Sequence, residues 1–320
     1  MFIFELLVLF AVGIFSQPGS QAATEGLKES QIVSAVEMPA FTMSVEVQGT
    51  HAFVGYRGGM QVFDISDPSD PKAIGALETT GTLHQIRTFD QLAYLACGFG
   101  GLQIVDISDP ASPELISSVD DLGEIKGLAL MGERVYTAGT NGDVFGFDVS
   151  DPASPEKIAQ RNLDKWSPFI AVDGDKGYVC NRSTGLVILD LEKKNFIRRI
   201  SATKTEHEPF GIAIEGDIAY IADKDAGLTI MDVRLPLRPK LLANFKLDHF
   251  AYSITLAGER AYVADLEGGV HVVDIADPEK PELIERVDTP DRAYQVAVSG
   301  RYGYVADGKG GLLVIEFAPE

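Results

Sequence analysis

Short apolar segments separated by Gly, Asp and Pro run along this chain from about residue 27 to its last residue. Residues 251–292 show the unit: AYSITLA is followed by RAYVADLE, VHVVDIADP and ELIERVD. Segments rich in Val, Ile and Tyr and bounded by turn residues are typical of strands. Apolar and polar positions alternate only weakly, as expected where both faces of a strand are buried. The unit therefore predicts four strands.

An acidic residue returns every 42 residues, and a strand-rich unit of about this period is typical of a propeller blade. Seven units fill residues 27–320, so we predict an all-β, seven-bladed β-propeller with four-stranded blades, forming one domain over residues 23–320. The repeats are centred on Asp64, Asp106, Asp148, Asp190, Asp232, Asp274 and Glu316.

Two repeated residue types are expected to be structural, because one active site would not need six copies of a group. The recurring Asp ends the third strand of each unit, where its carboxylate should accept hydrogen bonds from loop amides. A Tyr also recurs every 42 residues, and we expect it to pack between blades rather than to form an aromatic cofactor site. These residues are Tyr94, Tyr136, Tyr178, Tyr220, Tyr262 and Tyr304.

The two ends of the chain predict how the ring closes. The last repeat stops near Phe317 and lacks a fourth strand, whereas residues 31–37 (QIVSAVE) resemble the fourth strands at 114–120 (ELISSVD) and 282–288 (ELIERVD). We expect the N-terminal segment to supply the outer strand of the last blade, which would leave no open sheet edge at the seam.

The third-strand segments LQIVD (102–106), LVILD (186–190) and VHVVD (270–274) each follow a Gly, and most are followed by an Asp-Pro turn. In these features the chain resembles the LVIVD-repeat family. The resemblance implies a β-propeller that is secreted or attached to the cell surface in bacteria or archaea, and it implies no general catalytic motif. Repeat four departs from the pattern, because residues 191–194 replace the Asp-Pro turn and leave its outer edge less well defined.

The formal net charge of -20 limits the classes of partner that the protein is expected to bind. Lys and Arg are too few to line a phosphate backbone, so nucleic acid is not predicted as a partner. Anionic membranes are also disfavoured, whereas cations, basic proteins and neutral sugars are compatible with an acidic surface. The simplest role of this charge is to keep the protein in solution.

Residues 2–15 are nearly all apolar, and small residues follow at Ser20 and Ala22. This pattern predicts a signal peptide over residues 1–22 and a protein that is secreted, periplasmic or on the cell surface. An uncleaved membrane anchor is the alternative, because no basic residue precedes the apolar run. Cys97 and Cys180 lie in blades that are not neighbours, so we expect two free buried thiols.

Loops that vary between repeats indicate where a ligand would bind. The face with the Asp-Pro turns is nearly uniform, whereas the links between blades differ, and we call the face with these links the variable face. His207 and His249 occupy equivalent links on neighbouring blades, Asp291 follows on the next, and His84 lies in another link. Together His207, His249 and Asp291 are an alternative metal site. Their spacing matches no metal motif, so no cofactor is predicted.

Aromatic residues in the same links suggest a rim around the channel mouth. Trp166, Phe210, Tyr252 and Tyr294 would suit sugars or apolar side chains of a partner, although blade packing explains Phe210 and Tyr252 equally well. A further set of polar residues begins the turns between second and third strands. We expect these residues to cap turns rather than to bind Ca²⁺; they are Asn181, Asp223, Asp265 and Asp307.

These observations favour a non-catalytic scaffold that recognises an extracellular or envelope protein or glycan. The predicted ligand contacts are Trp166, Phe210, His84, His207, His249 and Arg292. The alternative is a carbohydrate lyase or hydrolase at the channel mouth, and a metal or cofactor carrier is a third hypothesis. In the enzyme, His207 or His249 would be the base, and Tyr252 or Tyr294 would be the acid. Arg292 would bind a carboxylate of the substrate. The ligand and the oligomeric state are left open.

Overall fold

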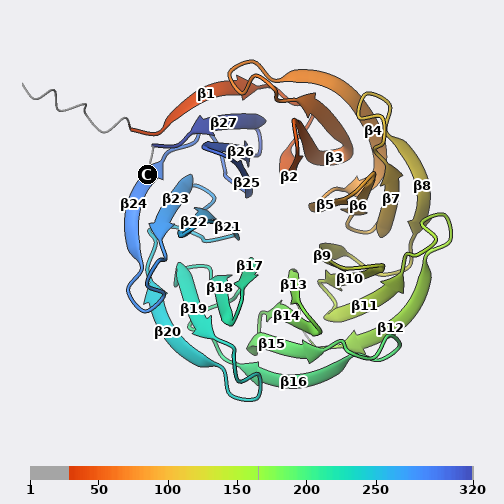
Figure 1. The fold of residues 1–320 in the computed structure, drawn as a ribbon, viewed down its shortest axis with the longest axis vertical. Helices are drawn as coiled ribbons and strands as arrows, with labels where there is room; N and C mark the ends of the chain where they lie inside the picture. Colours follow the sequence, from red (N-terminus) through yellow and green to blue (C-terminus); the bar gives the residue numbers. More distant parts are fainter. Residues whose placement is uncertain (1–28, 165, 319–320) are drawn as a thin grey trace, which may run out of the picture.

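The computed structural model describes residues 29–164 and 166–318, and these residues form strands and loops without a helix. Seven antiparallel sheets surround a central axis (Figure 1). Within a sheet the strands follow one another outward from the axis in sequence order. The last sheet differs only in that its outer strand comes from the N-terminal segment. The predicted all-β, seven-bladed propeller is confirmed. None of the described residues forms an apolar helix long enough to cross a membrane.

Each blade corresponds to one 42-residue repeat. The first three blades comprise β2 (Thr42–Gln48), β3 (His51–Asp64) and β4 (Lys72–Thr82); β5 (Gln85–Phe89), β6 (Leu92–Ala96), β7 (Leu102–Asp106) and β8 (Glu114–Val119); and β9 (Ile125–Met131), β10 (Arg134–Gly139), β11 (Asp143–Asp148) and β12 (Glu156–Asn162).

The next two blades follow the same plan, including the repeat that lacks an Asp-Pro turn. They comprise β13 (Ile170–Asp173), β14 (Lys176–Asn181), β15 (Gly185–Asp190) and β16 (Arg198–Thr203); and β17 (Ile212–Glu215), β18 (Ile218–Ala222), β19 (Leu228–Asp232) and β20 (Lys240–Phe245).

The last two blades comprise β21 (Ser253–Ala257), β22 (Arg260–Ala264), β23 (Val270–Asp274) and β24 (Glu282–Val287); and β25 (Gln295–Ser299), β26 (Tyr302–Ala306), β27 (Leu312–Glu316) and β1 (Gln31–Val36).

The first blade contains one strand, β3, in place of two. The first part of β3 pairs with β2, and its second part, from Gly59 to Asp64, pairs with β4. Gly58, between the two parts, has a φ of 94°, which favours glycine. The blade therefore has four strand segments, like the others.

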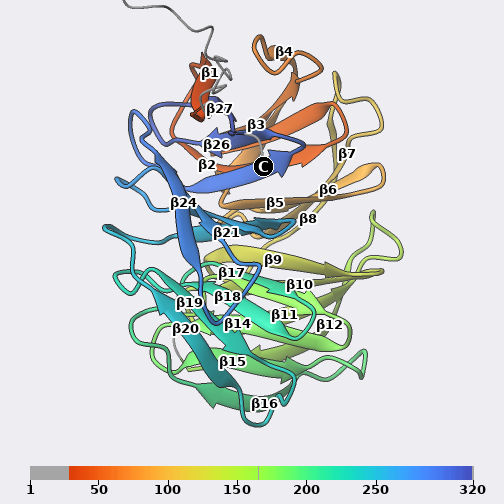
Figure 2. The same ribbon diagram turned by 60° about the vertical axis from the view of Figure 1, so that its left-hand side comes forward.

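The ring closes through the N-terminal strand, as the sequence predicts. β1 pairs antiparallel with β27 from Gln31 opposite Glu316 to Val36 opposite Leu312, and Figure 2 shows β1 at the outer edge beside β27. The Ala318 amide also donates to the Ser30 hydroxyl at 2.7 Å. These bonds join the two ends of the chain and pair the edge of β27.

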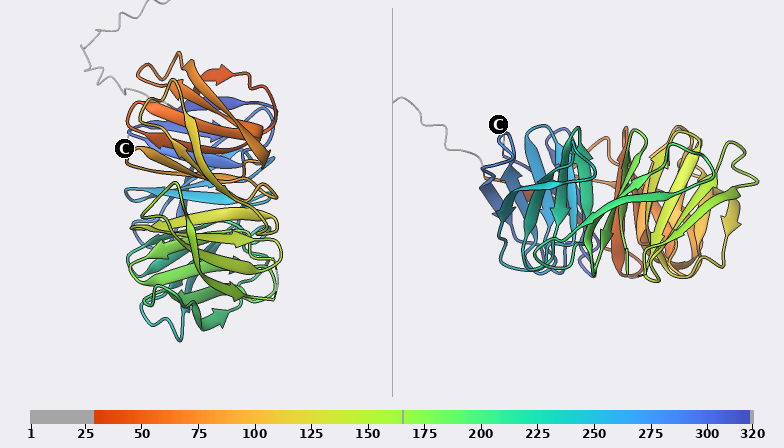
Figure 3. Two further views of the ribbon diagram at one scale, coloured as in Figure 1. Left: turned by 90° about the vertical axis from the view of Figure 1, so that its right-hand side faces the viewer. Right: turned by 90° about the horizontal axis from the view of Figure 1, so that it is seen from below.

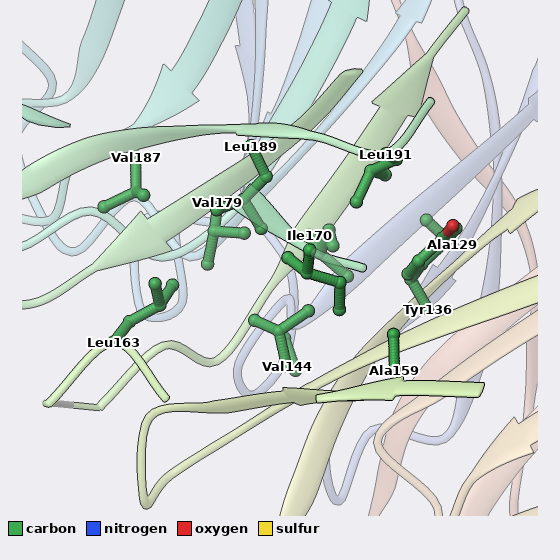
Figure 4. Packing of buried hydrophobic residues seen from close by; sticks show 12 residues of the cluster. Ala129, Tyr136, Val144, Ala159, Leu163, Ile170, Val179, Val187, Leu189 and Leu191 are labelled. Carbon is green, nitrogen blue, oxygen red and sulfur yellow. The ribbon is translucent and has the colours of Figure 1, made fainter. Parts of the chain in front are cut away.

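The hydrophobic core lies between neighbouring blades. Between the third and fourth blades, for example, Tyr136 and Val144 pack with Ile170, Val179 and Leu189 (Figure 4). The prediction that the repeated Tyr residues pack between blades is confirmed, because all six are at most 5% exposed. Cys97 and Cys180 are buried and free, also as predicted.

The repeated Asp residues end their strands and hold the following loop. Asp106 accepts a hydrogen bond from the Ser108 amide at 2.8 Å, and Asp190 accepts one from Glu192 at 3.0 Å. The same bond to the amide two residues ahead recurs in each of the six repeats, at Asp64, Asp106, Asp148, Asp190, Asp232 and Asp274. The prediction of a structural role is confirmed. Repeat four still forms its outer strand β16, where Arg198 pairs with Asp190 at 2.5 Å.

Candidate functional site

Hydrogen bonds join the links between blades to the turns between second and third strands, so both lie on one face of the disc, which Figure 3 shows edge-on. Carboxylates in the turns accept hydrogen bonds from link amides: Asp223 from His207 at 3.1 Å, Asp265 from His249 at 3.2 Å and Asp307 from Asp291 at 2.9 Å. These Asp residues therefore cap the links, and Asn181 caps its own turn through the amides of Ser183 and Thr184.

Aromatic rings form a continuous chain of contacts on this variable face. Trp166 meets Phe210 at 4.9 Å between ring centroids, Phe210 meets Tyr252 at 5.4 Å, and Tyr252 meets Tyr294 at 5.1 Å. Three more rings contact these four: Phe41 meets Tyr294, Phe169 meets Tyr252, and Phe250 meets Phe210. We call the seven residues the mouth cluster: Phe41, Trp166, Phe169, Phe210, Phe250, Tyr252 and Tyr294.

The mouth cluster combines packing with an exposed part. Phe210 and Tyr294 are buried, at 7% and 9% exposure, whereas Trp166, Phe250 and Tyr252 are partly exposed. Most contacts are edge-to-face, which is a favourable arrangement of aromatic rings. The four aromatic residues selected from the sequence thus lie together, and Trp166 presents part of its ring to solvent.

Cations surround the exposed aromatic rings. The Arg182 guanidinium lies 5.4 Å from the Trp166 ring centroid, and the Lys126 and Lys224 amines lie 6.0 and 5.6 Å from Trp166 and Phe250. Glu208 forms ion pairs with Arg182 at 2.8 Å and with Lys224 at 3.2 Å. The hydrogen bond from the Arg182 guanidinium lowers the pKa of the Glu208 carboxyl. These charges give the mouth cluster a polar border.

Sequence reasoning missed these cations, although the repeat carried a signal for them. Lys126 occupies the repeat position of His84, Phe210, Tyr252 and Tyr294. Arg182 and Lys224 are likewise equivalent to one another in neighbouring repeats. Aligning every link and turn position across all repeats would have found them.

The two exposed histidines do not gather with Asp291. His207 Nδ1 lies 3.8 Å from Asp225 Oδ2, and Asp291 accepts a bond from the Lys309 amide at 2.7 Å. Within the described ranges, no group of three or more His, Cys, Asp or Glu residues could hold a metal ion. The alternative metal site from His207, His249 and Asp291 is therefore not assembled here.

His84 lies inside the mouth rather than on its rim. Its residue is 7% exposed, its Nε2 is 3.8 Å from Glu124 Oε1, and its Nδ1 has no hydrogen-bond partner in the described part of the chain. Burial, with a smaller effect of Lys126, lowers the pKa of His84 to about 3, so the imidazole is neutral at physiological pH.

The residues of the alternative enzyme site have other partners. Arg292 pairs with Glu267 at 2.7 Å, and both side chains are about half exposed. Burial raises the pKa of the Tyr252 hydroxyl well above its usual value, so Tyr252 holds its proton more tightly than a free phenol.

Below the mouth cluster, a central channel of about 490 Å³ is lined by the innermost strand of every blade. Its only charged lining residues are Arg87 and Glu46, whose Nη1 and Oε2 atoms are 2.9 Å apart. Burial raises the pKa of the Glu46 carboxyl, and this effect outweighs the opposing charge of Arg87. Neither Arg87 nor Glu46 was expected from the sequence to be functional.

Known structures share this fold at low sequence identity. The WD40 domain of Neurospora crassa Pan2 superposes with a TM-score of 0.73 at 12% identity, covering 92% of this chain and 97% of that domain. The computationally designed Ika8 protein superposes with a TM-score of 0.68 at 9% identity, covering 90% of this chain and 99% of its own. These likenesses concern the fold alone.

No curated protein sequence matches the chain. The family described as LVIVD repeat matches more than half of it, at residues 41–79, 86–121, 210–246, 250–289 and 291–316. The unmatched stretch between residues 121 and 210 includes repeat four, where the Asp-Pro turn is replaced. The chain therefore belongs to the LVIVD-repeat family.

Proposed function

We propose that this propeller is a recognition scaffold that binds a protein or glycan outside the cell through its variable face. The observation that carries the proposal is the mouth cluster, in which Trp166 is partly exposed beside Arg182 and Lys126. Trp, Tyr and Arg are the residues most enriched among the energetically dominant contacts of binding surfaces.

The arrangement suits a neutral or locally acidic ligand. An aromatic face can stack on the apolar side of a sugar ring or on an apolar side chain, and the neighbouring cations and Glu208 can bind hydroxyl or charged groups at the border. No other repeat has a Trp at the position of Trp166.

Catalysis has weaker support from the geometry. The exposed imidazoles of His207 and His249 belong to separate links, and Arg292 is engaged by Glu267. A base and an acid must lie within hydrogen-bond reach of one substrate bond. We therefore prefer binding to a lyase or hydrolase reaction.

Trp166 also provides the test, because it is the only Trp in the chain and its fluorescence reports on the mouth cluster. The purified protein is applied to a glycan array and to separated envelope proteins of its native host. The affinity of each hit for every variant is measured by isothermal titration calorimetry, and Trp166 emission is followed in the proteins that retain this residue. We expect hits that change the Trp166 emission and that bind about tenfold or more weakly to Arg182→Ala and Trp166→Ala.

The matched control is Phe196→Ala, since Phe196 is 53% exposed on a loop that joins the third and fourth strands of its blade. This variant should bind like the parent. Hits that bind equally to the parent, Trp166→Ala and Arg182→Ala would show that the variable face is not the binding surface.

A further inference from the structure

The central channel has the size and walls of a small-molecule site. Its volume of about 490 Å³ falls within the roughly 300–1,000 Å³ that is usual for ligand pockets. Its walls combine aliphatic residues, such as Leu130, Val172, Ile214 and Leu256, with a similar share of polar atoms. A ligand that fills such a channel needs both apolar and polar parts.

Arg87 and Glu46 interrupt the repeat pattern of these walls. The position of Arg87 is occupied by Ala in four other repeats, at Ala129, Ala171, Ala213 and Ala297. The position of Glu46 is occupied by Leu, Ile or Val in five repeats, at Leu130, Val172, Ile214, Leu256 and Val298. Both side chains are partly exposed to the channel, and the other repeats show that a blade forms without this pair.

The hydrogen bonds of Arg87 leave part of its guanidinium available. Nη1 donates to Glu46 at 2.9 Å and to the Ile86 carbonyl at 3.1 Å, and no bond from Nε or Nη2 forms within residues 29–164 and 166–318. Glu46 therefore holds the guanidinium in place while one edge of its planar fork remains open. That edge matches the two oxygens of a carboxylate.

Further donors lie beside Arg87 where the channel narrows. Gln85 and Gln295 use their side-chain oxygens to accept bonds from the Leu128 and Val45 amides, at 2.7 and 3.3 Å. Their NH₂ groups remain as donors at the level of Arg87. The Ser253 hydroxyl, which lines the same narrow part, is buried without a partner in the described part of the chain.

We propose that the channel binds a small carboxylate with an apolar body. The carboxylate is held by Arg87 with Gln85 and Gln295, and the body lies against the aliphatic walls. The donors at this level are Arg87, Gln85 and Gln295, and Arg87 engages one oxygen, Oε2, of the Glu46 carboxylate. This site adjoins the mouth cluster on its inner side and does not depend on the function proposed for that cluster.

The ligand enters from the face opposite the mouth cluster. Phe169, Tyr252 and Tyr294 line the narrow part between the mouth and the channel, whose volume of about 20 Å³ has room for about one water molecule. The net charge of -20 opposes an anion at long range. At physiological ionic strength this repulsion is screened beyond about 8 Å, whereas Arg87 acts at contact.

Hexanoate is the probe, and its binding is measured by isothermal titration calorimetry and by thermal melting of the full folded domain. Hexan-1-ol and hexylammonium are the matched comparators, since they share the apolar chain without the carboxylate. We expect saturable binding of one hexanoate per chain and little response to the comparators. Absence of hexanoate binding, or equal binding of hexan-1-ol, would overturn the proposal.

Variants identify the site. Arg87→Gln should weaken hexanoate binding by about ten- to a hundredfold, the usual effect of losing hydrogen bonds to a charged group. Glu46→Gln should bind hexanoate at least as tightly, because it frees the guanidinium. The control Arg234→Gln removes an exposed Arg paired with Asp232 and should leave binding unchanged.

A second variant keeps the test decisive if Arg87→Gln does not fold. Ala213→Met places a larger side chain at the repeat position of Arg87 on another blade, and thereby fills the channel while leaving Arg87 intact. We expect it to abolish hexanoate binding with its melting transition retained. Undiminished binding to folded Ala213→Met or Arg87→Gln would contradict a site in the channel.

Discussion

At the scale of single residues, two sets of aspartates respond to pH in opposite directions. The Asp residues that end the third strands accept loop amides; at Asp106 the hydrogen bonds with Ser108 lower the pKa of the carboxyl. At Asp265, buried in a turn of the variable face, burial raises the pKa to about 7. The first set stabilises the fold when ionised, whereas Asp265 destabilises it when ionised.

Asp265→Asn should make the protein less sensitive to pH between about 4 and 7. The folded-state pKa of Asp265 is raised, so its contribution to stability is fully present below the unfolded pKa near 3.8 and is lost as pH rises through about 7. Asn stays neutral and can still accept the His249 amide. Melting temperatures across this pH range should therefore diverge in favour of the variant as pH increases.

His271 must be allowed for in that comparison, because its Nδ1 lies 3.5 Å from Asp265 Oδ2. Burial lowers the pKa of His271 to about 4, so its protonation reduces stability as pH falls from about 6.5. Making the comparison in a His271→Gln background removes this titration from both proteins. Parallel melting curves for the two proteins from pH 4 to pH 7.5 would contradict the assignment of Asp265.

Tyr220→Ala should destabilise the protein by about 3 kcal/mol or more, because it empties a space between blades that is filled by a side chain only 4% exposed. Urea unfolding measures the difference. Asp106→Ala should also lower the midpoint by leaving the Ser108 amide without its partner. Unfolding midpoints equal to that of the parent would show that these repeated residues do not stabilise the blades.

At the scale of elements, the decisive contact is between β1 and β27. This pair joins residues nearly a whole chain length apart, and it covers an edge whose Leu312, Leu313, Val314 and Ile315 are all buried. An unpaired apolar edge strand is a template for aggregation. The contact also makes the N-terminal segment part of the last blade rather than a tail.

Deletion of residues 27–37 should lower the melting temperature and promote aggregation, as observed by differential scanning calorimetry and size-exclusion chromatography. Adding a synthetic peptide of residues 29–38 should restore part of the stability by strand addition, whereas a scrambled peptide should not. A truncated protein that melts like the parent and stays monodisperse would refute the closure.

At the scale of the whole molecule, the propeller carries chemistry only where its repeats differ. The uniform features, such as the aspartate turns, recur in six of the seven repeats and stabilise the fold. The mouth cluster and the Arg87–Glu46 pair occur once, at the axis. Function is therefore expected at the mouth cluster and in the channel beside it.

Chelation by EDTA should leave the melting temperature unchanged. An ion held only by the folded protein at about 1,000 times its dissociation constant would add roughly 4 kcal/mol to stability, which a chelator would remove. His207, His249 and Asp291 do not come together, so we expect no such response. A chelator-sensitive melt that disappears in His207→Ala would make a metal site the leading hypothesis.

Protein isolated from its native host should lack residues 1–22, because an apolar run followed by small residues is the pattern of a secretory signal. These residues lie outside the described part of the structure, and the expectation rests on the sequence. N-terminal sequencing that begins at Met1 on material from the envelope would favour the uncleaved anchor instead.

The sequence by itself determined the blades, their number and the closing strand, because these depend on local features that repeat: apolar segments of strand length, turn residues and an aspartate at a fixed interval. It also selected Trp166, Phe210, Tyr252 and Tyr294 as neighbours, since equivalent positions in a ring of blades converge on its axis. Only the tertiary structure decided which side chains face one another there. The Arg87–Glu46 pair joins different blades, and His84 turns inward to a buried position, because burial and pairing at the axis depend on contributions from seven segments that are distant in the sequence.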